Sequence, residues 1–377
     1  MSRNAIYCSA LRMKTGELTG VLALATDVAD CLLPRFIVPP QSERDDKQPL
    51  LFVVDRVPDF SKALSRHWRG RDALIDLTYL IDECGRDRIA EWLPSSFKRA
   101  RQAGGRPVPM ATLADLGASE VTAFASAIDH TEDLRFAISV PFDEMEGPEF
   151  RVALSAALNR LGITPTCCAV IADFSGAEFS DPRVVAPIIT GALETFQEFG
   201  PWRHTIFQGS HFPSTNPAEP DGREVWPRHE WQAWKGAVHL DPATAVHLMF
   251  GDYAADCSKI AFGGGGGRAI PHYRYATEDA WVVERGARTG SDKDNMRRVC
   301  QRIVQGGNFA GAGFSAADEF ILRTSQGGAP GNSTNWRQIN TTHHITRVIA
   351  DIAKVRGIAI TEKRVDADDR QTSLVLL

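Results

Sequence analysis

The feature that most constrains the fold is an alternation of short apolar segments with longer amphipathic segments through residues 5–253. Strands that are buried on both faces read as short apolar runs, and the helices that cover them carry a one-sided apolar stripe. Eight segments read as strands, and nearly all are followed by a helix candidate. They are AIYCSAL, PRFIVPP, DALIDLTYL, RPVPMATL, DLRFAISVP, TCCAVIADF, WRHTIFQGS and AVHLMFGDY.

This repetition predicts an α/β fold, a (β/α)8 TIM-like barrel, because open parallel sheets more often have fewer strands. A doubly wound sheet with a second domain is the alternative, since residues 40–60 interrupt the alternation and leave room for a further strand. The barrel is favoured.

The pattern changes after residue 253, where five consecutive glycines (263–267) precede two β-rich segments and a helix candidate. The last helix candidate, THHITRVIADIAKVRG, has the apolar spacing of a core-facing helix. We expect residues 1–253 and 339–377 to form the barrel, with 254–338 as an insertion between its last strand and last helix. The glycine run lacks a phosphate-loop context, GxxxxGK followed by Ser or Thr, so we interpret it as a hinge leading to a β-hairpin.

Composition favours a cytoplasmic protein that binds neither membranes nor nucleic acid. Hydrophobic residues make up 43% and charged residues 24% of the chain, and a formal charge of −5 is spread without a basic stripe. No apolar stretch reaches the roughly 18 residues of a membrane span, and the first residues lack the apolar core of a signal peptide. The seven cysteines form no CxxC pair, which indicates reduced thiols rather than disulfides or a zinc site.

In a barrel, functional side chains follow the strands at the carboxyl-terminal end. Arg12 and Lys14 follow the first strand candidate, close to the start of a helix, where they are suited to a phosphate or carboxylate. The predicted insertion would bring further cations over the barrel mouth, as a lid does. The candidate ligand-binding residues are Lys14, Glu17, Tyr253, Arg274, Tyr275 and Arg285.

Carboxylates at three strand candidates are candidates for acid–base chemistry. Asp76 lies inside an apolar run, where a carboxylate is costly unless it is paired, so a base, a metal ligand and a partner of a structural arginine all remain open. Oxygen ligands would suit Mg²⁺, but no spacing is diagnostic and we predict no metal. Two adjacent histidines point about 100° apart on a helix, so at most one is expected to act. The candidate catalytic residues are Asp76, Asp173, Asp252, His343 and His344.

Several fragments in order along the chain carry a family resemblance: LRMKTGEL, WQAWKGA, FGDYA, YRYATEDAWVVERG and NTTHHIT. With them the chain resembles the "beta protein" family of phages and bacteria. The resemblance covers most of the chain and implies that the candidate residues within these fragments belong to the family pattern. It also implies a setting of mobile elements and defence-type genes, and with it a role in phage–host conflict.

The sequence therefore predicts a barrel that binds or transforms a small anionic ligand, phosphorylated or not, at its carboxyl-terminal face. The alternative is a non-catalytic, protein-binding component of a phage-related or anti-phage defence system, because a fold does not fix a function. Whether the protein is an enzyme stays open, and no pattern indicates a cofactor.

Overall fold

The computed structural model describes residues 5–40, 58–116, 120–259 and 270–360 of the 377-residue chain. Its contacts divide the chain into two compact units, which interleave along the sequence. The first unit comprises the described residues within Met1–Met13, Leu33–Ser210 and His229–Tyr253, and the second those within Lys14–Leu32, His211–Arg228 and Ala254–Leu377. The glycine run and most of residues 40–60 lie outside the described residues, so the hinge and the extra strand stay predictions.

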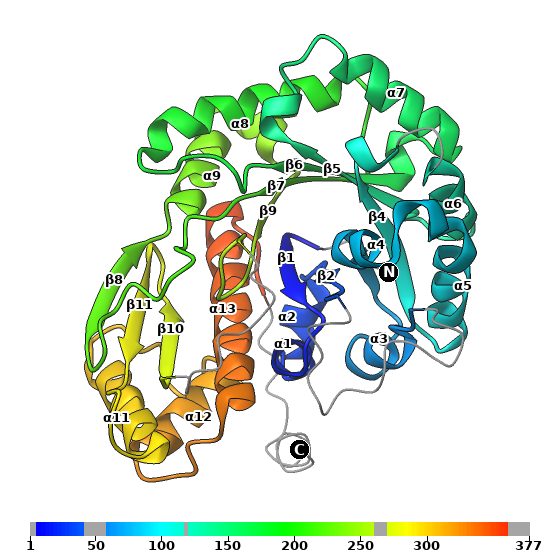
Figure 1. Cartoon of the computed structure of the whole chain (residues 1–377). Helices are drawn as coiled ribbons and strands as arrows, with labels where there is room; N and C mark the ends of the chain where they lie inside the picture. The colour runs from blue at the N-terminus through cyan, green and yellow to red at the C-terminus, as the bar shows by residue number, and fades with distance from the viewer. Residues whose placement is uncertain (1–4, 41–57, 117–119, 260–269, 361–377) are drawn as a thin grey trace. The chain divides into compact units, whose positions relative to one another are not determined.

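The first unit contains a closed barrel of eight strands, and every neighbouring pair is parallel. Figure 1 shows these strands enclosing one interior. The predicted (β/α)8 fold is confirmed, and each strand candidate overlaps one barrel strand. In barrel order the strands are β1 (Tyr7–Arg12), β2 (Arg35–Ile37), β3 (Asp72–Asp76), β4 (Arg106–Thr112), β5 (Phe136–Pro141), β6 (Cys168–Asp173), β7 (His204–Gln208) and β9 (Leu248–Asp252).

Helices of the first unit lie outside the strands, with α5 to α8 forming an outer arc in Figure 1. Asp181 caps the start of α8 by accepting a hydrogen bond from the Arg183 amide (3.1 Å). Gly162 ends α7 in the left-handed conformation (φ 65°). The helices are α3 (Ser61–His67), α4 (Thr78–Cys84), α5 (Ile89–Gln102), α6 (Glu120–Ala127), α7 (Phe150–Leu161), α8 (Pro182–Gln197), α9 (His229–Leu240) and α10 (Pro242–Ala245), with 3-10 turns η2 (Arg86–Arg88), η3 (Ala114–Leu116), η4 (Phe142–Glu144) and η5 (Pro165–Cys167).

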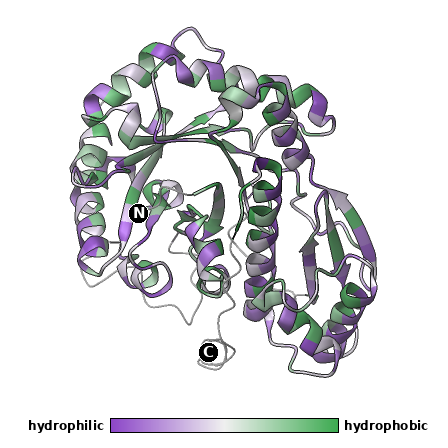
Figure 2. Cartoon of the chain, turned by 180° about the vertical axis from the view of Figure 1, so that it is seen from behind, coloured by the Kyte–Doolittle hydropathy of each residue, from purple (hydrophilic) through white to green (hydrophobic). Residues whose placement is uncertain are grey.

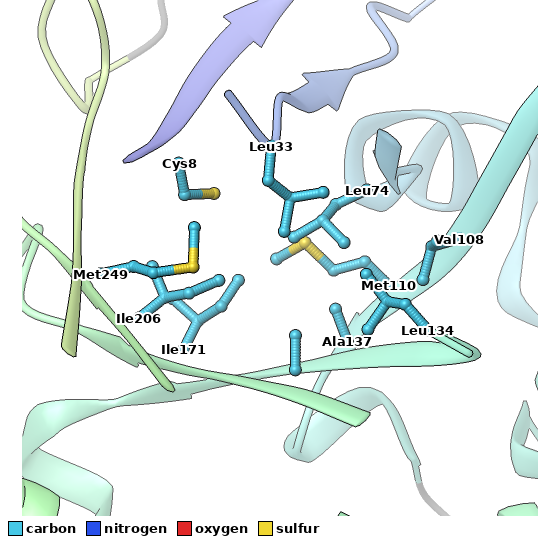
Figure 3. Close-up of a cluster of buried hydrophobic side chains, with 11 residues drawn as sticks. Cys8, Leu33, Leu74, Val108, Met110, Leu134, Ala137, Ile171, Ile206 and Met249 are labelled. Atoms are coloured by element: carbon cyan, nitrogen blue, oxygen red, sulfur yellow. The ribbon is translucent and has the colours of Figure 1, made fainter. Parts of the chain in front are cut away.

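The barrel interior is filled by apolar side chains, which Figure 3 shows converging from the surrounding strands. Successive side chains on a strand point to opposite faces, so these residues identify the inward face of each strand. The hydropathy colouring of Figure 2 shows apolar residues along the strands, while the outer helices alternate apolar and polar residues. The interior residues are Cys8, Leu33, Leu74, Val108, Met110, Leu134, Ala137, Ala169, Ile171, Ile206 and Met249.

The second unit is built on a three-stranded antiparallel sheet in the order β10-β11-β8. Its elements are β8 (Arg223–Pro227), β10 (His272–Ala276), β11 (Ala280–Arg285), α1 (Thr15–Leu22), α2 (Thr26–Asp30), α11 (Asp292–Gln305), α12 (Ala316–Ser325) and α13 (Ser333–Arg356). The strands β10 and β11 pair where the sequence predicts a hairpin. The sequence did not predict β8 or α12.

The longest helix of the second unit, α13, begins earlier than its apolar stripe indicates, because Asn332 and Asn335 form a capping box at its start. It packs closely against α1: a methyl group at Gly20 would lie 2.8 Å from Cβ of Thr341. The contacts of α13 group it with the second unit. Its predicted role as the last barrel helix stays a prediction.

Candidate functional site

Polar side chains lie at the carboxyl-terminal end of the barrel interior. Five of these side chains come two residues after an apolar residue of the barrel interior, and because alternate residues of a strand share a face, they face inward too. Tyr253 follows the end of β9, two residues beyond Gly251. We call this set the barrel cluster: Arg35, Asp76, Ser139, Asp173, Gln208 and Tyr253.

Arg35 and Asp76 form the buried ion pair of the barrel cluster. The Nε and Nη2 groups of Arg35 donate to Oδ2 of Asp76 at 3.0 and 2.7 Å. Oδ1 of Asp76 accepts from the Thr78 amide (3.0 Å) and hydroxyl (2.7 Å). Burial alone would raise the pKa of Asp76, but Arg35 and the Thr78 hydrogen bonds outweigh it and hold that pKa below its usual value. Asp76 is thus an ionised carboxylate with both oxygens bonded.

Asp173 lies on the other side of the same guanidinium. Its Oδ2 is 3.9 Å from Nη1 of Arg35, beyond hydrogen-bond distance, and 3.4 Å from the Ser139 hydroxyl. Its Oδ1 accepts from the Ser175 amide at 2.9 Å. The side chain of Asp173 is 16% exposed, whereas that of Asp76 is 5% exposed. Asp173 therefore keeps acceptor capacity that Asp76 has already used.

Arg35 itself retains an unused donor. Nη1 is buried and has no hydrogen-bond partner among the described residues. Nearly all buried polar atoms in proteins are hydrogen-bonded, so a free guanidinium edge beside a carboxylate needs an explanation. Oδ2 of Asp173, at 3.9 Å, is the carboxylate oxygen beside this open donor.

Tyr253 places a phenol at this end of the barrel. Burial raises the pKa of Tyr253, and the neighbouring charge of Asp173 raises it further. The phenol is therefore a neutral hydrogen-bond donor at ordinary pH. Arg35, Asp173 and Asp76 all contribute to the electrostatic environment of Tyr253, which indicates that the phenol lies close to these charged groups.

Gln208 lies at the end of β7, where it pairs in register with Asp173 on β6. It is completely buried, and neither Oε1 nor Nε2 has a hydrogen-bond partner among the described residues. Its neighbour across the β7–β9 pair is Gly251, where a methyl group would lie 3.1 Å from Oε1 of Gln208. The glycine thus leaves room for the amide.

Asp252 lies on the opposite face of its strand from Tyr253. It pairs in register with Ser9, and the Tyr7 hydroxyl donates to its Oδ1. On the same face Phe250 packs against Trp231 and Trp234 of α9, with ring centroids 5.1 and 5.7 Å apart. The structure therefore places Asp252 between sheet and helices, apart from Asp76 and Asp173, and its catalytic role stays a prediction.

The predicted cationic residues of the second unit have partners of their own. Nη1 of Arg274 donates to the Ala255 carbonyl (2.7 Å) and to Oδ1 of Asp256 (2.8 Å), and that of Arg285 to the Ala218 carbonyl (2.8 Å). Lys14 precedes the first turn of α1, and in that turn Glu17 is buried, 3.9 Å from Arg337. Their ligand-binding roles stay predictions.

His343, Tyr275, Asp318 and Ser315 form a second buried polar group, which we call the His343 cluster. The His343 ring lies 3.0 Å from Oδ2 of Asp318 through Nδ1 and 2.8 Å from the Ala276 carbonyl through Nε2, and it stacks on Tyr275 at 3.8 Å. Asp318 also accepts from the hydroxyls of Tyr275 (2.6 Å) and Ser315 (2.5 Å). Both ring nitrogens are engaged within the chain, which favours a structural role for this cluster. The catalytic roles of His343 and His344 stay predictions. The adjacent His344 stacks on Trp281 at 4.4 Å.

No sulfur or metal chemistry stands out in the described parts of the chain. The seven cysteines are unpaired, and burial raises the pKa of Cys8 to about 12, so its thiol is inert. Within those ranges, no group of three or more His, Cys, Asp or Glu side chains is arranged to hold a metal ion. No helix there combines the length and apolar character needed to cross a membrane.

The sequence pointed to Asp76, Asp173 and Tyr253 but missed Arg35, Ser139 and Gln208. Arg35 is the first residue of β2, so its backbone does not lie at the carboxyl-terminal strand end where the sequence places functional side chains. Its long side chain nevertheless reaches Asp76 at the end of β3. Gln208 satisfies the same strand-end rule as Asp173 and could have been found if uncharged polar residues had been included.

The fold and the cluster define the class of the protein, a (β/α)8 barrel with a buried polar group at its carboxyl-terminal end, where barrel enzymes carry their sites. The family model described as Beta protein matches residues 7–350. The chain belongs to this beta protein family. No curated protein matches it.

Proposed function

We propose that the carboxyl-terminal end of the barrel binds a small anionic molecule, held by Arg35, with Asp173 as the group that accepts a proton from it. The observation that carries the proposal is the buried Nη1 of Arg35, which has no hydrogen-bond partner among the described residues and lies 3.9 Å from Asp173. Guanidinium groups recognise carboxylate and phosphate oxygens with strong, charge-assisted hydrogen bonds. An anionic oxygen at Nη1 would use the donor that the chain leaves open.

The two carboxylates take different parts in this proposal. Asp76 is bonded to Arg35 and Thr78 through both oxygens, so it fixes the guanidinium rather than exchanging a proton. Asp173 has the spare acceptor capacity and the greater exposure, which suit a general base. A developing negative charge on the ligand would lie against Arg35, in surroundings that strengthen the attraction.

The test is thermal unfolding of the full-length protein with inorganic phosphate, sulfate and acetate as probes. A ligand at a hundred times its Kd stabilises the folded state by about 2.7 kcal/mol. Arg35→Lys keeps the charge but removes the planar donor edge, and should abolish the stabilisation by the probe that binds best. Arg106→Lys is the matched control. Arg106 is the first residue of β4, and it pairs with Asp72 at the start of β3 and with Glu132 before β5, so these ion pairs lie at the amino-terminal ends of the strands.

Asp173→Asn sharpens the test, because it removes a negative charge beside the anion. The variant should bind the best probe several-fold more tightly than the unaltered protein. If no probe stabilises the protein, or if Arg106→Lys abolishes the effect as fully as Arg35→Lys, the barrel site is rejected. The protein-binding component of a phage-related or defence system then becomes the better candidate.

A further inference from the structure

Gln208 lowers the stability of the folded protein relative to an apolar side chain of similar size at the same position. Its amide carries donors and an acceptor, and both of its polar atoms are buried with no partner among the described residues. A buried polar group without a hydrogen bond costs roughly 1–3 kcal/mol, and a methionine of similar size would avoid that cost. The amide is therefore expected to find its partners on a molecule that is not part of the chain.

The position of Gln208 connects it with the anion site. It lies beside Asp173 in the register of β6 and β7, and neighbouring strands are about 4.8 Å apart. Asp173 in turn lies 3.9 Å from the open donor of Arg35. One compact molecule can therefore contact Arg35 through an anionic group and Gln208 through another group a few bonds away.

We propose that Gln208 is a specificity-determining residue and that the ligand carries an N–H donor beside a C=O acceptor, as a primary carboxamide or the lactam edge of a nucleobase does. This inference rests on the proposed function, because the same ligand must supply the anion. A side-chain amide pairs with such a group through two parallel hydrogen bonds, whichever way the amide is oriented. At Gly251 a methyl group would lie 2.8 and 3.0 Å from the backbone oxygens of Phe207 and Cys8 and 3.1 Å from the amide oxygen of Gln208, so only glycine leaves the space beside the amide unoccupied.

Two matched pairs of probes separate the amide contribution from the anion contribution. Succinamate and levulinate are carboxylates of the same shape, and only succinamate has the amide nitrogen. Uridine monophosphate and ribose phosphate share a phosphate, and only the nucleotide has a lactam edge. The first pair tests a simple carboxamide acid and the second tests a nucleotide, each by titration calorimetry on the full-length protein.

The unaltered protein should prefer the amide-bearing member of at least one pair by roughly tenfold to a hundredfold, the range for one bidentate amide contact. Gln208→Met should bind both members of that pair equally, and no more tightly than the unaltered protein binds the member without the amide. Gln208→Leu serves as a second variant should the methionine not be accommodated. Gln197→Met, on the exposed face of α8, is the control and should keep the preference.

Each outcome decides something different. Equal binding of both members of each pair by the unaltered protein, or a preference that survives in Gln208→Met and Gln208→Leu, overturns the role of Gln208 but leaves the anion site intact. Failure of all four probes to bind overturns the anion site and this inference with it.

Discussion

The barrel cluster and the His343 cluster are two buried groups of ionisable and polar side chains in the same chain, and they differ in how completely they are hydrogen-bonded. In the His343 cluster both ring nitrogens of His343 and both oxygens of Asp318 have partners. In the barrel cluster Nη1 of Arg35 and the whole amide of Gln208 have none among the described residues. Burial alone therefore does not distinguish these two groups, whereas their hydrogen bonding does.

The difference follows from what each arrangement must do. A network in which every group is satisfied stabilises one conformation and has nothing left to offer a ligand. A network with open donors and acceptors is less stable by itself, but it can bind a partner without first breaking bonds of its own. Stability lost at such positions is commonly associated with function.

The largest expected effect comes from breaking the satisfied cluster. Asp318→Ala would leave the Tyr275 and Ser315 hydroxyls and the Nδ1 atom of His343 without their acceptor. Removing one partner from a buried charged network costs about 3–5 kcal/mol, so the urea midpoint of unfolding should fall sharply. The neighbouring Glu319→Gln, at a partly exposed position, should change it little.

The matching change in the barrel, Asp173→Asn, should cost about 1 kcal/mol or less, because Asp173 holds few groups that depend on it. Equal losses for Asp318→Ala and Asp173→Asn would remove the distinction between the two clusters.

A smaller effect depends on pH and comes from His272, a partly buried histidine of the second unit. Burial lowers the pKa of His272, and the neighbouring charges of Arg274, Arg337 and Arg285 lower it further, to about 4. The unfolded chain binds a proton near pH 6.5 that folded His272 refuses, so stability falls as the pH drops from about 6.5 to about 4.

The expected loss across that window is about 1–3 kcal/mol from His272, with a similar loss from His204 in β7, whose pKa burial also lowers to about 4. Urea unfolding at pH 7 and pH 5 measures it, and His272→Gln should reduce the difference between the two midpoints. A variant with the full pH dependence would show that His272 is protonated in the folded protein.

Much of the barrel was predictable because its strands and helices leave local patterns in the sequence. The hydrogen bonds of the candidate site join residues that are distant in sequence, so no local pattern predicts them. Period and length identified every barrel strand, and the strand-end rule found Asp76 and Asp173. The same rule selected Asp252, which the alternation of β9 turns to the outer face beside Tyr7. Neighbouring residues on a strand face opposite sides of the sheet, so an error of one residue in choosing the strand-end position selects a side chain on the wrong face.

The absence of a partner is equally invisible in the sequence. Arg35 was not singled out because its segment looks like an ordinary apolar strand, and its role depends on which of its nitrogens Asp76 occupies. Gln208 was missed because an uncharged amide at a strand end is common. Only the arrangement of strands around one interior shows that these two groups keep unused hydrogen bonds.

The last expected effect has the opposite sign from the others and bears most directly on the comparison. Gln208→Met replaces an amide without partners among the described residues by an apolar side chain of similar length, so the protein without ligand should become more stable by about 1–2 kcal/mol. Thermal unfolding measures the gain, and Gln197→Met at the exposed position sets the baseline. A loss of stability in Gln208→Met would mean that the amide is already satisfied in the folded protein, and the barrel cluster would then be as structural as the His343 cluster.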